Sequence, residues 1–556
     1  MANKKKLRIG FLLDSLIVPN RYYELIEFAS RFERFERPLI VYGYRKQSTN
    51  IYKVFEKVNF FGAFSIIKIP LFNFILGTIT KIENKMLPLE LKWYTKSSDI
   101  RNDKNLDYLK IEGVLSKSGK NLTINKNDKV KFKKANLDLI IRCGTGILSE
   151  DFLNAAKLGI LSMHNGDNRI NRGVPAGFWE IMNREPSTGF VIQKLTKELD
   201  GGKILKRGNF MTQTTWSKNR LANQKKINFF MIELLKEISY IGKLPKSERA
   251  SFHDRKLYKL DYNFGILIKY IVRVWVVSVF KKAKNRFPNG AKKWQVAYSF
   301  SDTPSKSLWK YKRITNPAGS FLADPFAVNF EDKNVIFVEE YSTIEKKGKI
   351  SAIEINNSGD KYLGPVLDEA YHISFPFTFV HNKKVYMLPE TSSINEIRVY
   401  ECIKFPVQWK YKMTLMKGVD ASDSMIIRKN GFWFLLTNIC SVKNGDHLSE
   451  LHIFYSKNIF TTNWKPIRNG NPVILDSNKA RNGGMYKHEG RLFRVSQFHK
   501  FGHYGYSIKV NEIKSLSING YEEEFMQLIS PKFFPKQKSI HHFHSNNILS
   551  VFDYHC

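Results

Sequence analysis

The stretch from Ser162 to Leu205 gathers the residues of this chain that are best suited to chemistry. It places His164 in a Gly/Asn-rich loop and Asp200 beside two glycines. A histidine that titrates near neutral pH can act as a general base or donate to a developing oxyanion, and a nearby carboxylate fixes its tautomer. A strand–helix–strand pattern between the two residues predicts that their segments end at the same edge of a sheet. The stretch therefore indicates an acid–base pair, with a purely structural histidine and aspartate as the alternative.

The elements before this stretch predict the scaffold that must position it. Residues 7–15, 37–44 and 137–149 have the apolar character of buried strands, and a segment with helical spacing lies between the first two. This alternation favours a parallel sheet covered by helices. The third strand runs through Arg142 into a turn at Gly144 and Gly146, which offers backbone N–H groups and room for a flat ligand. No GxGxxG motif follows the first strand, so a dinucleotide site is not expected.

The order of these pieces resembles the formyltransferase family, which includes methionyl-tRNA and sugar N-formyltransferases. The motifs that carry the resemblance are LIIRCGTG, His164, Arg172-Gly173, Thr188-Gly189 and Leu199-Asp200-x-Gly202. The resemblance is close over residues 135–210 and loose over residues 1–245, and it implies an α/β Rossmann-like domain. It further implies a primary amine as acceptor and 10-formyltetrahydrofolate as donor, bound at Arg142, Gly144, Gly146 and Gly173.

By the same resemblance, His164 takes the amine proton or stabilises the tetrahedral intermediate, and Asp200 holds the histidine. Ser162 stands where the family has an asparagine that contributes to the oxyanion site. Because losing one oxyanion donor costs about 100- to 1000-fold in rate, either Asn165, Asn168 or Arg169 replaces it or the chemistry has changed. The polar loop after the histidine is predicted to bind the substrate through Asp167, Asn168, Arg169 and Arg172, and Arg169 and Arg172 are predicted to read an anionic acceptor.

The C-terminal half carries an internal repeat. Each unit has a short strand, a polar turn and an aromatic-rich second strand, and five units begin at ADPFAVNF, FPFTFVHN, SDSMIIRK, GGMYKHEG and IHHFHSNN. Their spacing of about 50 to 60 residues is the length of a four-stranded blade. Residues 291–556 are therefore predicted to form an all-β five-bladed propeller. Polar residues at related repeat positions are predicted to converge on its central channel: Asp324, Glu390, Asp423, Arg481, Gln497, His542 and Asp553.

The motifs LADPF, EEY, SFPF, YMLPET, FRVSQ, HYGY and HHFH resemble the domain at the N-terminus of plant glucosamine inositolphosphorylceramide transferases. They are more distantly similar to five-bladed inverting glycosidases of the arabinanase type. Those enzymes use a carboxylic acid and a carboxylate across a channel, with a third carboxyl group that tunes the acid. Asp324, Glu390 and Asp423 lie on three successive predicted blades, as such a triad requires. Glycan binding, glycan hydrolysis or transfer, and a scaffold role all remain open.

Composition sets the remaining expectations. The 556 residues are too many for one core, and the predicted parts are residues 1–250, a basic apolar helical linker at 251–290, and residues 291–556. The net charge of +38 favours an anionic partner, or else is a solvated surface. Four scattered cysteines indicate neither a structural zinc site nor a disulfide framework, and no metal is expected.

The apolar run at 264–280 contains Lys269 and Arg273, so a spanning helix is not expected. It is interpreted either as a helix on an anionic membrane surface or as a helix between the domains. A cytoplasmic protein, at most peripheral to the inner face of the membrane, is predicted.

Together these patterns predict a folate-dependent N-formyltransferase that acts on an amino sugar in surface-polysaccharide biosynthesis. The amino sugar is expected to be nucleotide- or lipid-linked, with a glycan as a further ligand of the propeller. Methionyl-tRNA formyltransferases carry a small β-barrel after the catalytic domain and none is readable here, so a nucleic-acid partner is not expected. The high positive charge leaves a tRNA acceptor as a minor alternative. The alternative is a propeller protein that binds, transfers or hydrolyses glycans and carries an inactive formyltransferase-like domain.

Overall fold

In the computed structural model the chain divides into two units, Met1–Phe280 and Lys281–Cys556. The structure describes residues 6–43, 45–46, 60–115, 121–144, 146–167, 169–198, 201–249, 257–258, 260, 262–276, 294–301, 308–443 and 445–556. Asp200, Asn168 and much of the predicted linker lie outside these residues. The domain boundaries inferred from the sequence stay a prediction.

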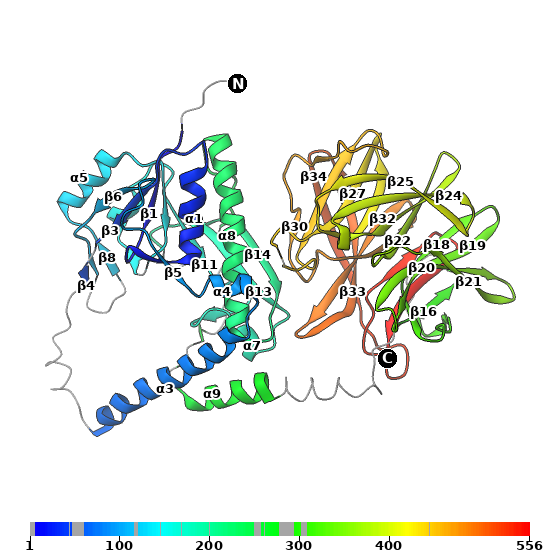
Figure 1. Ribbon diagram of the computed structural model, residues 1–556, viewed down its shortest axis with the longest axis horizontal. Coiled ribbons are helices and arrows are strands. Elements are labelled where there is room, and N and C mark those ends of the chain that lie inside the picture. Colours follow the sequence, from blue (N-terminus) through cyan, green and yellow to red (C-terminus); the bar gives the residue numbers. More distant parts are fainter. Residues whose placement is uncertain are drawn as a thin grey trace. The chain divides into compact units, whose positions relative to one another are not determined.

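A seven-stranded sheet forms the centre of the first unit (Figure 1). Its order is β14 (Lys203–Met211), β13 (Ser187–Lys194), β11 (Ile160–His164), β9 (Leu139–Arg142), β1 (Ile9–Leu12), β3 (Leu39–Tyr42) and β6 (Asp107–Lys110). The five strands from β11 to β6 are parallel, whereas β13 and β14 are antiparallel to their neighbours. The predicted α/β sheet is present, with a mixed edge.

Helices and short strands complete this unit. The helices are α1 (Asn20–Arg31), α3 (Phe60–Lys85), α4 (Leu89–Trp93), α5 (Lys126–Ala135), α6 (Glu150–Leu153), α7 (Phe178–Met182), α8 (Trp216–Ile241) and α9 (Phe264–Tyr270), which continues as the π-helical segment Ile271–Val276. Minor strands are β2 (Ile17–Pro19), β4 (Arg45–Lys46), β5 (Ser97–Asp99), β7 (Val114–Leu115), β8 (Asn121–Thr123), β10 (Ile147–Leu148), β12 (Arg172–Gly173) and β15 (Leu257–Tyr258). Among the described residues, no helix is long and apolar enough to cross a membrane.

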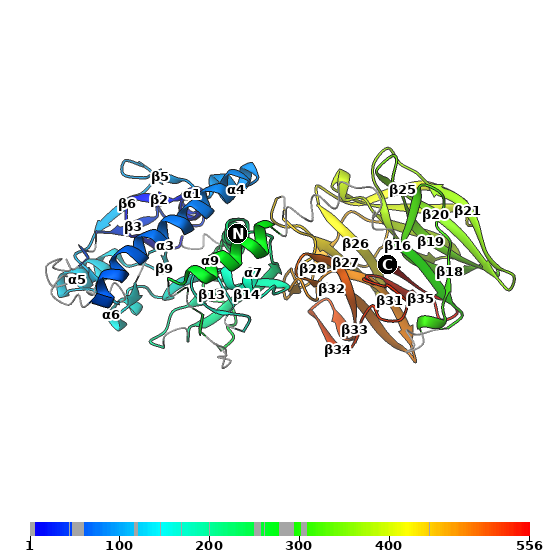
Figure 2. The ribbon, with the colours of Figure 1, turned by 90° about the horizontal axis from the view of Figure 1, so that it is seen from below.

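A buried carboxyl group fastens α9 to the first unit. Glu83 of α3 accepts hydrogen bonds from the Tyr270 hydroxyl at 2.5 Å and from the Ser217 amide at 2.8 Å. The indole of Trp275 donates to the same carboxyl group at 3.2 Å. Because a buried carboxyl group is costly unless hydrogen-bonded, these contacts fix α9 against α3 and α8, and Figures 1 and 2 show α3 and α9 side by side.

The second unit is a five-bladed propeller, which confirms the predicted all-β fold (Figure 2). Four blades are β18 (Ser320–Phe330) to β21 (Gly359–Leu367), β22 (Ser374–His381) to β25 (Gln408–Lys417), β26 (Ala421–Lys429) to β30 (Ile474–Leu475), and β31 (Asn482–His488) to β34 (Gly520–Ile529). Between these ends lie β19 (Lys333–Ser342), β20 (Lys347–Asn356), β23 (Lys384–Glu390), β24 (Glu396–Lys404), β27 (Phe432–Ile439), β28 (Glu450–Ser456), β29 (Lys465–Pro466), β32 (Arg491–Lys500) and β33 (His503–Ser517).

The fifth blade joins the two ends of the propeller sequence. Its strands are β35 (Phe543–Ser545), β36 (Ser550–His555), β16 (Trp294–Ser299) and β17 (Lys312–Arg313). In the pairing of β16 with β36, Trp294 lies opposite His555 and Ser299 lies opposite Ser550. Closure of the ring by this pairing removes the open sheet edges that a linear array of blades would expose.

The innermost strands of four blades share an irregularity. A two-residue bulge interrupts β18, β22, β26 and β31 near their beginnings. Its first residue has left-handed backbone geometry in three blades, with φ of 48° at Asp324, 46° at Phe375 and 49° at Asp423. Bulges of this kind redirect side chains, and here they set the positions of two carboxyl groups of the channel.

A buried arginine secures the chain segment that enters β31. Arg494 is fully buried and bonds both oxygens of Glu523 at 2.7 Å. It also donates to the backbone carbonyls of Lys479 and Ala480, at 2.7 and 3.2 Å. Arg494 thereby fixes the segment that carries Arg481 into the channel.

We expect Arg494→Ala to lower the free energy of unfolding of the propeller by about 3–5 kcal/mol, because it leaves Glu523 without its buried partner. Urea denaturation of the full chain, followed by near-UV circular dichroism, measures this loss. Arg491→Ala is the matched control, since Arg491 pairs with Glu489 and Glu512 at a surface position that is 46% exposed, where ion pairs contribute about 0–1 kcal/mol. Equal losses in the two variants would contradict the role of Arg494.

Candidate functional site

One half of the site in the propeller is built around Arg481. Its guanidinium binds Asp423 through two nitrogens, one of them 3.1 Å from Oδ1, and lies 3.7 Å from Oε2 of Glu390. The Ser392 hydroxyl donates to Glu390 at 2.8 Å. The Gln497 amide donates to Asp423 at 3.4 Å and to the carbonyl of Asn482 at 2.9 Å. Three blades thus contribute to one arrangement of two carboxyl groups and one cation.

The other half is built around His541. Its Nδ1 lies 2.7 Å from Oδ1 of Asp553, and its Nε2 lies 3.8 Å from Oδ1 of Asp324. Asp553 also accepts the backbone N–H groups of Asp324 and His542, each at 3.0 Å. The Trp294 ring stacks on the His541 ring with centroids 3.9 Å apart. Asp553 therefore fixes both the histidine and the bulge that presents Asp324.

The carboxyl groups of this cluster have pKa values shifted in opposite directions. Burial raises the pKa of Asp324 to about 6. Burial also raises the pKa of Glu339 and of Asp423 well above the usual range, the latter in spite of Arg481. Burial acts in the same sense on Glu390, but the charge of Arg481 and the hydrogen bonds from Ser392 and Asp423 lower its pKa below the ordinary value.

The cations of the cluster balance the groups that stay ionised. Burial lowers the pKa of His541, but its ion pair and hydrogen bond with Asp553 outweigh this and raise it. The charge of Asp423 raises the pKa of Arg481 in spite of burial. Carboxyl groups held in different protonation states within one cluster are the usual basis of paired acid and base catalysis. The side chains of Asp324, Glu390 and Arg481 keep 12, 13 and 13% of their surface exposed, so a ligand can reach them.

The structure brings all seven predicted channel residues to this cluster: Asp324, Glu390, Asp423, Arg481, Gln497, His542 and Asp553. Nδ1 of His542 lies 3.7 Å from Oδ1 of Asp324, and the His542 ring packs edge-on against Phe326 and Phe375 at 4.6 and 5.4 Å. Burial lowers the pKa of His542 far below the usual value, so it is a neutral part of the core.

The sequence analysis did not single out His541 or Glu339. His541 precedes His542 in the HHFH motif, and Glu339 belongs to the EEY motif. Glu339 lies on β19, where adjacent residues face opposite sides, so only the register of the strand decides whether Glu339 or Glu340 faces the channel. His541 precedes β35, and both it and His542 lie beside Asp324.

Two groups of residues in the propeller could hold a metal ion. Asp324, His541 and Asp553 form one, and Asp420, Cys440 and His447 form the other, each with ligand atoms within 4.8 Å of one another. In both groups the histidine already contacts a carboxylate, at 2.7 Å for His541–Asp553 and 2.6 Å for His447–Asp420.

The residues predicted in the first unit have a different arrangement. Ser162 is buried on β11 between Arg142 of β9 and Gln193 of β13, and His164 ends β11 opposite Val191. Because β13 is antiparallel, its end lies beside the start of β11, where the Leu195 amide bonds the Ile160 carbonyl. The predicted shared edge rested on parallel strands and is wrong. Asp200 itself lies outside the described residues.

The loop after His164 is held by its own charges. Asp167 is buried and bonds the guanidinium groups of Arg169 and Arg207, with closest distances of 2.8 and 2.6 Å. Burial raises the pKa of Asp167, but these partners outweigh it and lower the pKa. Gly189 permits this arrangement, because a Cβ there would lie 2.4 Å from the Asp167 side chain. Asp167 and Arg169 thus engage each other.

Other predicted residues are placed as follows. Arg142 bonds the carbonyl of Gly146 and closes the turn that includes Gly144. The buried side-chain oxygen of Asn165 makes no hydrogen bond among the described residues. Arg172 and Gly173 form β12, which pairs with β15. Asn168 lies outside the described residues.

The fold and the cluster define a five-bladed propeller with a channel rich in carboxyl groups, and comparison with known proteins agrees for this unit. Residues 289–539 match the family model of the N-terminal part of glucosamine inositolphosphorylceramide transferase 1. The protein of that name from Arabidopsis thaliana is 32% identical over 263 residues, 41% of this chain and 33% of the relative. The one from Oryza sativa subsp. japonica is 28% identical over 283 residues, 45% of this chain and 37% of the relative. The chain thus spans about a third of the length of these relatives.

Solved structures resemble parts of the chain only weakly. A GH43_1 enzyme from Xanthomonas citri has 11% identity and a TM-score of 0.32, covering 43% of this chain and 88% of its own. A sugar N-formyltransferase from a Shewanella species has 12% identity and a TM-score of 0.27, covering 48% and 88%. Scores this low carry no weight for either unit.

These findings correct the function predicted from the sequence. The named relatives are glucosamine inositolphosphorylceramide transferases, so the predicted folate-dependent formyltransferase, its one-carbon enzyme class and its place in amino-sugar polysaccharide biosynthesis are wrong. They favour the alternative, a propeller protein of glycan chemistry. The binding of 10-formyltetrahydrofolate and the cytoplasmic location remain untested predictions.

The raised pKa of Asp324 should make stability depend on pH. Unfolded aspartate ionises near pH 3.9, whereas Asp324 in the folded chain does so at about 6. Between these values the folded state keeps a proton that the unfolded state has lost, so stability falls as pH rises from about 4 to about 6. Urea midpoints at pH 4, 5, 6 and 7 should fall less steeply for Asp324→Asn, which cannot ionise. Identical profiles for the variant and the original chain would contradict the shift.

Proposed function

We propose that the propeller acts on a glycan and transfers or hydrolyses a glycosyl group at the carboxyl cluster around Arg481. The observation that carries this proposal is the coexistence of an ionised Glu390 and an Asp324 whose pKa is about 6. Glycosyl chemistry requires such a pair, one group to protonate the leaving oxygen and one to take a proton from the incoming nucleophile. The relatives' names, which describe transferases, support the same class.

The roles of the two groups follow from their environments. Asp324, protonated below pH 6, would donate its proton to the glycosidic oxygen as the bond from that oxygen to the anomeric carbon breaks. Glu390 would accept the proton of an acceptor hydroxyl or water as the new bond to the anomeric carbon forms. The side chain of Asp423 is only 3% exposed, and through its contact with Arg481 it would adjust the pKa values of Asp324 and Glu390. The relatives' names suggest glucosamine, carried on a lipid, as the sugar class.

We expect Glu390→Gln and Asp324→Asn each to lower turnover at least about 100-fold, since general acid–base groups contribute 10²–10⁴-fold. Glucosamine oligosaccharides incubated with the full chain, with products followed by mass spectrometry, provide the measurement. Activity of the original chain should also decline above about pH 6, as Asp324 loses its proton.

Asp332→Asn, in the exposed turn between β18 and β19, is the matched control for the loss of one carboxylate. Unchanged turnover in both cluster variants would contradict the assignment. Absence of any product from the original chain would contradict glycosyl chemistry on this sugar class.

We also propose that the first unit touches an anionic membrane surface through α3 and α9. Ile268, Val272 and Val276 are 62, 49 and 41% exposed at a spacing of four residues, and Phe74 of α3 is 72% exposed. Large apolar side chains exposed in such a stripe mark interaction sites. Lys269 and Arg273 adjoin the stripe, and the acidic residue of the two helices, Glu83, is buried. An apolar stripe beside cations fits an anionic bilayer surface.

We expect Phe74→Asp combined with Val272→Asp to reduce binding to vesicles of phosphatidylglycerol and phosphatidylcholine at least about tenfold. The change removes apolar contacts and adds two charges that anionic lipids repel. Co-sedimentation at low and high salt measures it. Ile344→Asp, at an 84% exposed propeller position, is the control for a lost surface hydrophobe. Equal binding by all variants would contradict the proposal.

A further inference from the structure

A cavity of the propeller lies further along the same innermost strands that carry the carboxyl cluster. It has a volume of about 510 Å³ and is lined by the later residues of the innermost strands, among them Val328 of β18, Phe379 of β22, Ile427 of β26, Lys487 of β31 and His544 of β35. Asp324 and Asp423 lie on two of these strands, three residues before the lining residues Ala327 and Ile426. At about 3.3 Å per residue, three residues of strand separate the carboxyl cluster from the near end of the cavity by roughly 10 Å.

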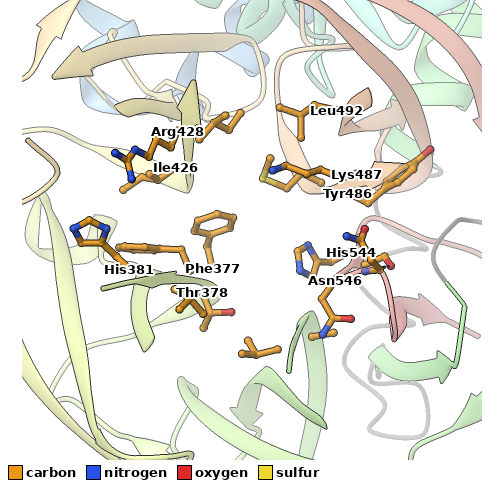
Figure 3. Close-up of a pocket in the computed structure, with 18 of the residues that line it drawn as sticks. Phe377, Thr378, His381, Ile426, Arg428, Tyr486, Lys487, Leu492, His544 and Asn546 are labelled. Atoms are coloured by element: carbon orange, nitrogen blue, oxygen red, sulfur yellow. Dashed lines mark hydrogen bonds between the residues drawn. The ribbon is translucent and has the colours of Figure 1, made fainter. Parts of the chain in front are cut away.

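The charge of this cavity is opposite in kind to that of the cluster. Arg428 and Lys487 line it and, as Figure 3 shows, stand on opposite sides of its opening. None of the residues that line it is acidic. Within the described part of the chain neither Arg428 nor Lys487 forms an ion pair, although Arg428 lies 5.5 Å over the ring of Trp433. Two cations at one opening, without a carboxylate among them, fit an anionic ligand.

The wall of the cavity also offers unused hydrogen-bonding groups. Thr378 and His544 are each 8% exposed. Oγ1 of Thr378 has no hydrogen-bond partner in the described residues, whereas the His544 ring is hydrogen-bonded to the backbone of Met485 and Ala327. The buried amide nitrogen of Asn546, like Oγ1 of Thr378, is unpaired among the described residues. Figure 3 shows these three side chains around the cavity, below the two cations. Because a buried polar group without a partner is costly, the placement of Thr378 and Asn546 suits a ligand that carries hydroxyl groups.

Aromatic faces complete the lining. Phe377, Trp433 and Tyr486 contribute apolar surface, and Trp433 is held edge-on by the His381 ring at 5.2 Å. Cavities of some 300–1,000 Å³ with apolar walls and a few directed polar groups are typical of small-molecule sites. Burial lowers the pKa of His544 to about 4, so at neutral pH this histidine is neutral and does not add a third charge.

We propose that this cavity is a second ligand site, which binds a sugar or polyol carrying a phosphate group. The phosphate, with a charge of about −1.5 to −2 at pH 7, matches the two cations Arg428 and Lys487 at the opening. The hydroxyl groups of the ligand reach Thr378 and Asn546, and its apolar ring face lies against the aromatic side chains. The site is separate from the carboxyl cluster and does not depend on glycosyl chemistry there.

Isothermal titration of the full chain with glucose 6-phosphate tests this proposal, with glucose, inorganic phosphate and glucuronate as comparison ligands. Glucose 6-phosphate should bind at least about tenfold more tightly than any of the three, because it alone combines sugar hydroxyl groups with a group of charge near −2, whereas glucuronate carries a charge of −1. Equal affinity for inorganic phosphate would overturn the sugar part of the proposal, and equal affinity for glucuronate would overturn the phosphate part.

The double variant Arg428→Gln, Lys487→Gln should weaken the binding of glucose 6-phosphate at least about tenfold, since hydrogen bonds to charged groups contribute about 1.5–3 kcal/mol each. Thr378→Val, which keeps the shape of the side chain, should weaken it several-fold. The control Lys465→Gln, Arg468→Gln removes the same charge from exposed positions that do not line the cavity. An equal loss in the control, or unchanged affinity in the cavity variants, would overturn the site.

Discussion

The contact of Arg481 with Asp423 and Glu390 is the interaction on which the channel depends. Placing carboxyl groups where water has little access is unfavourable unless a cation and hydrogen bonds compensate them. Arg481 provides that compensation, since it binds Asp423 directly and lies 3.7 Å from Glu390. One cation cannot balance two carboxylates fully, so one carboxyl group keeps its proton while the other is ionised. The difference in protonation between the two carboxyl groups is therefore a consequence of their burial.

Other parts of the propeller serve to hold this contact in place. Arg494 fixes the segment that carries Arg481, through the carbonyls of Lys479 and Ala480. The bulges in β18 and β26 present Asp324 and Asp423, and the closing blade brings Asp553 and His541 beside Asp324. Residues from the beginning and the end of the propeller sequence thus meet at one point. A cluster of this kind can form only when the ring is closed.

The sequence predicted the propeller and most of its channel because both follow from repetition. Equivalent positions of repeated blades occupy equivalent places around the axis, so Asp324, Asp423 and Arg481 could be found by comparing the units. Glu339 could not, because neighbouring residues of β19 face opposite sides and the repeat does not fix the register. His541 lies before β35, where no strand periodicity indicates the direction of a side chain. In the first unit, the alternation of strand and helix indicated a sheet but not the direction of β13. The pattern between His164 and Asp200 therefore predicted that their strands end at the same edge of the sheet. The antiparallel pairing of β11 and β13 places those ends at opposite edges.

The distribution of charge links the two units. The chain carries a net charge of +38, yet several of its acidic groups gather at one end of the propeller channel, where Arg481 and His541 accompany them. Cations without acidic neighbours are found at the other end of the channel and beside the apolar stripe of α9. A neutral or cationic sugar is suited to the first environment, and phosphate groups are suited to the other two.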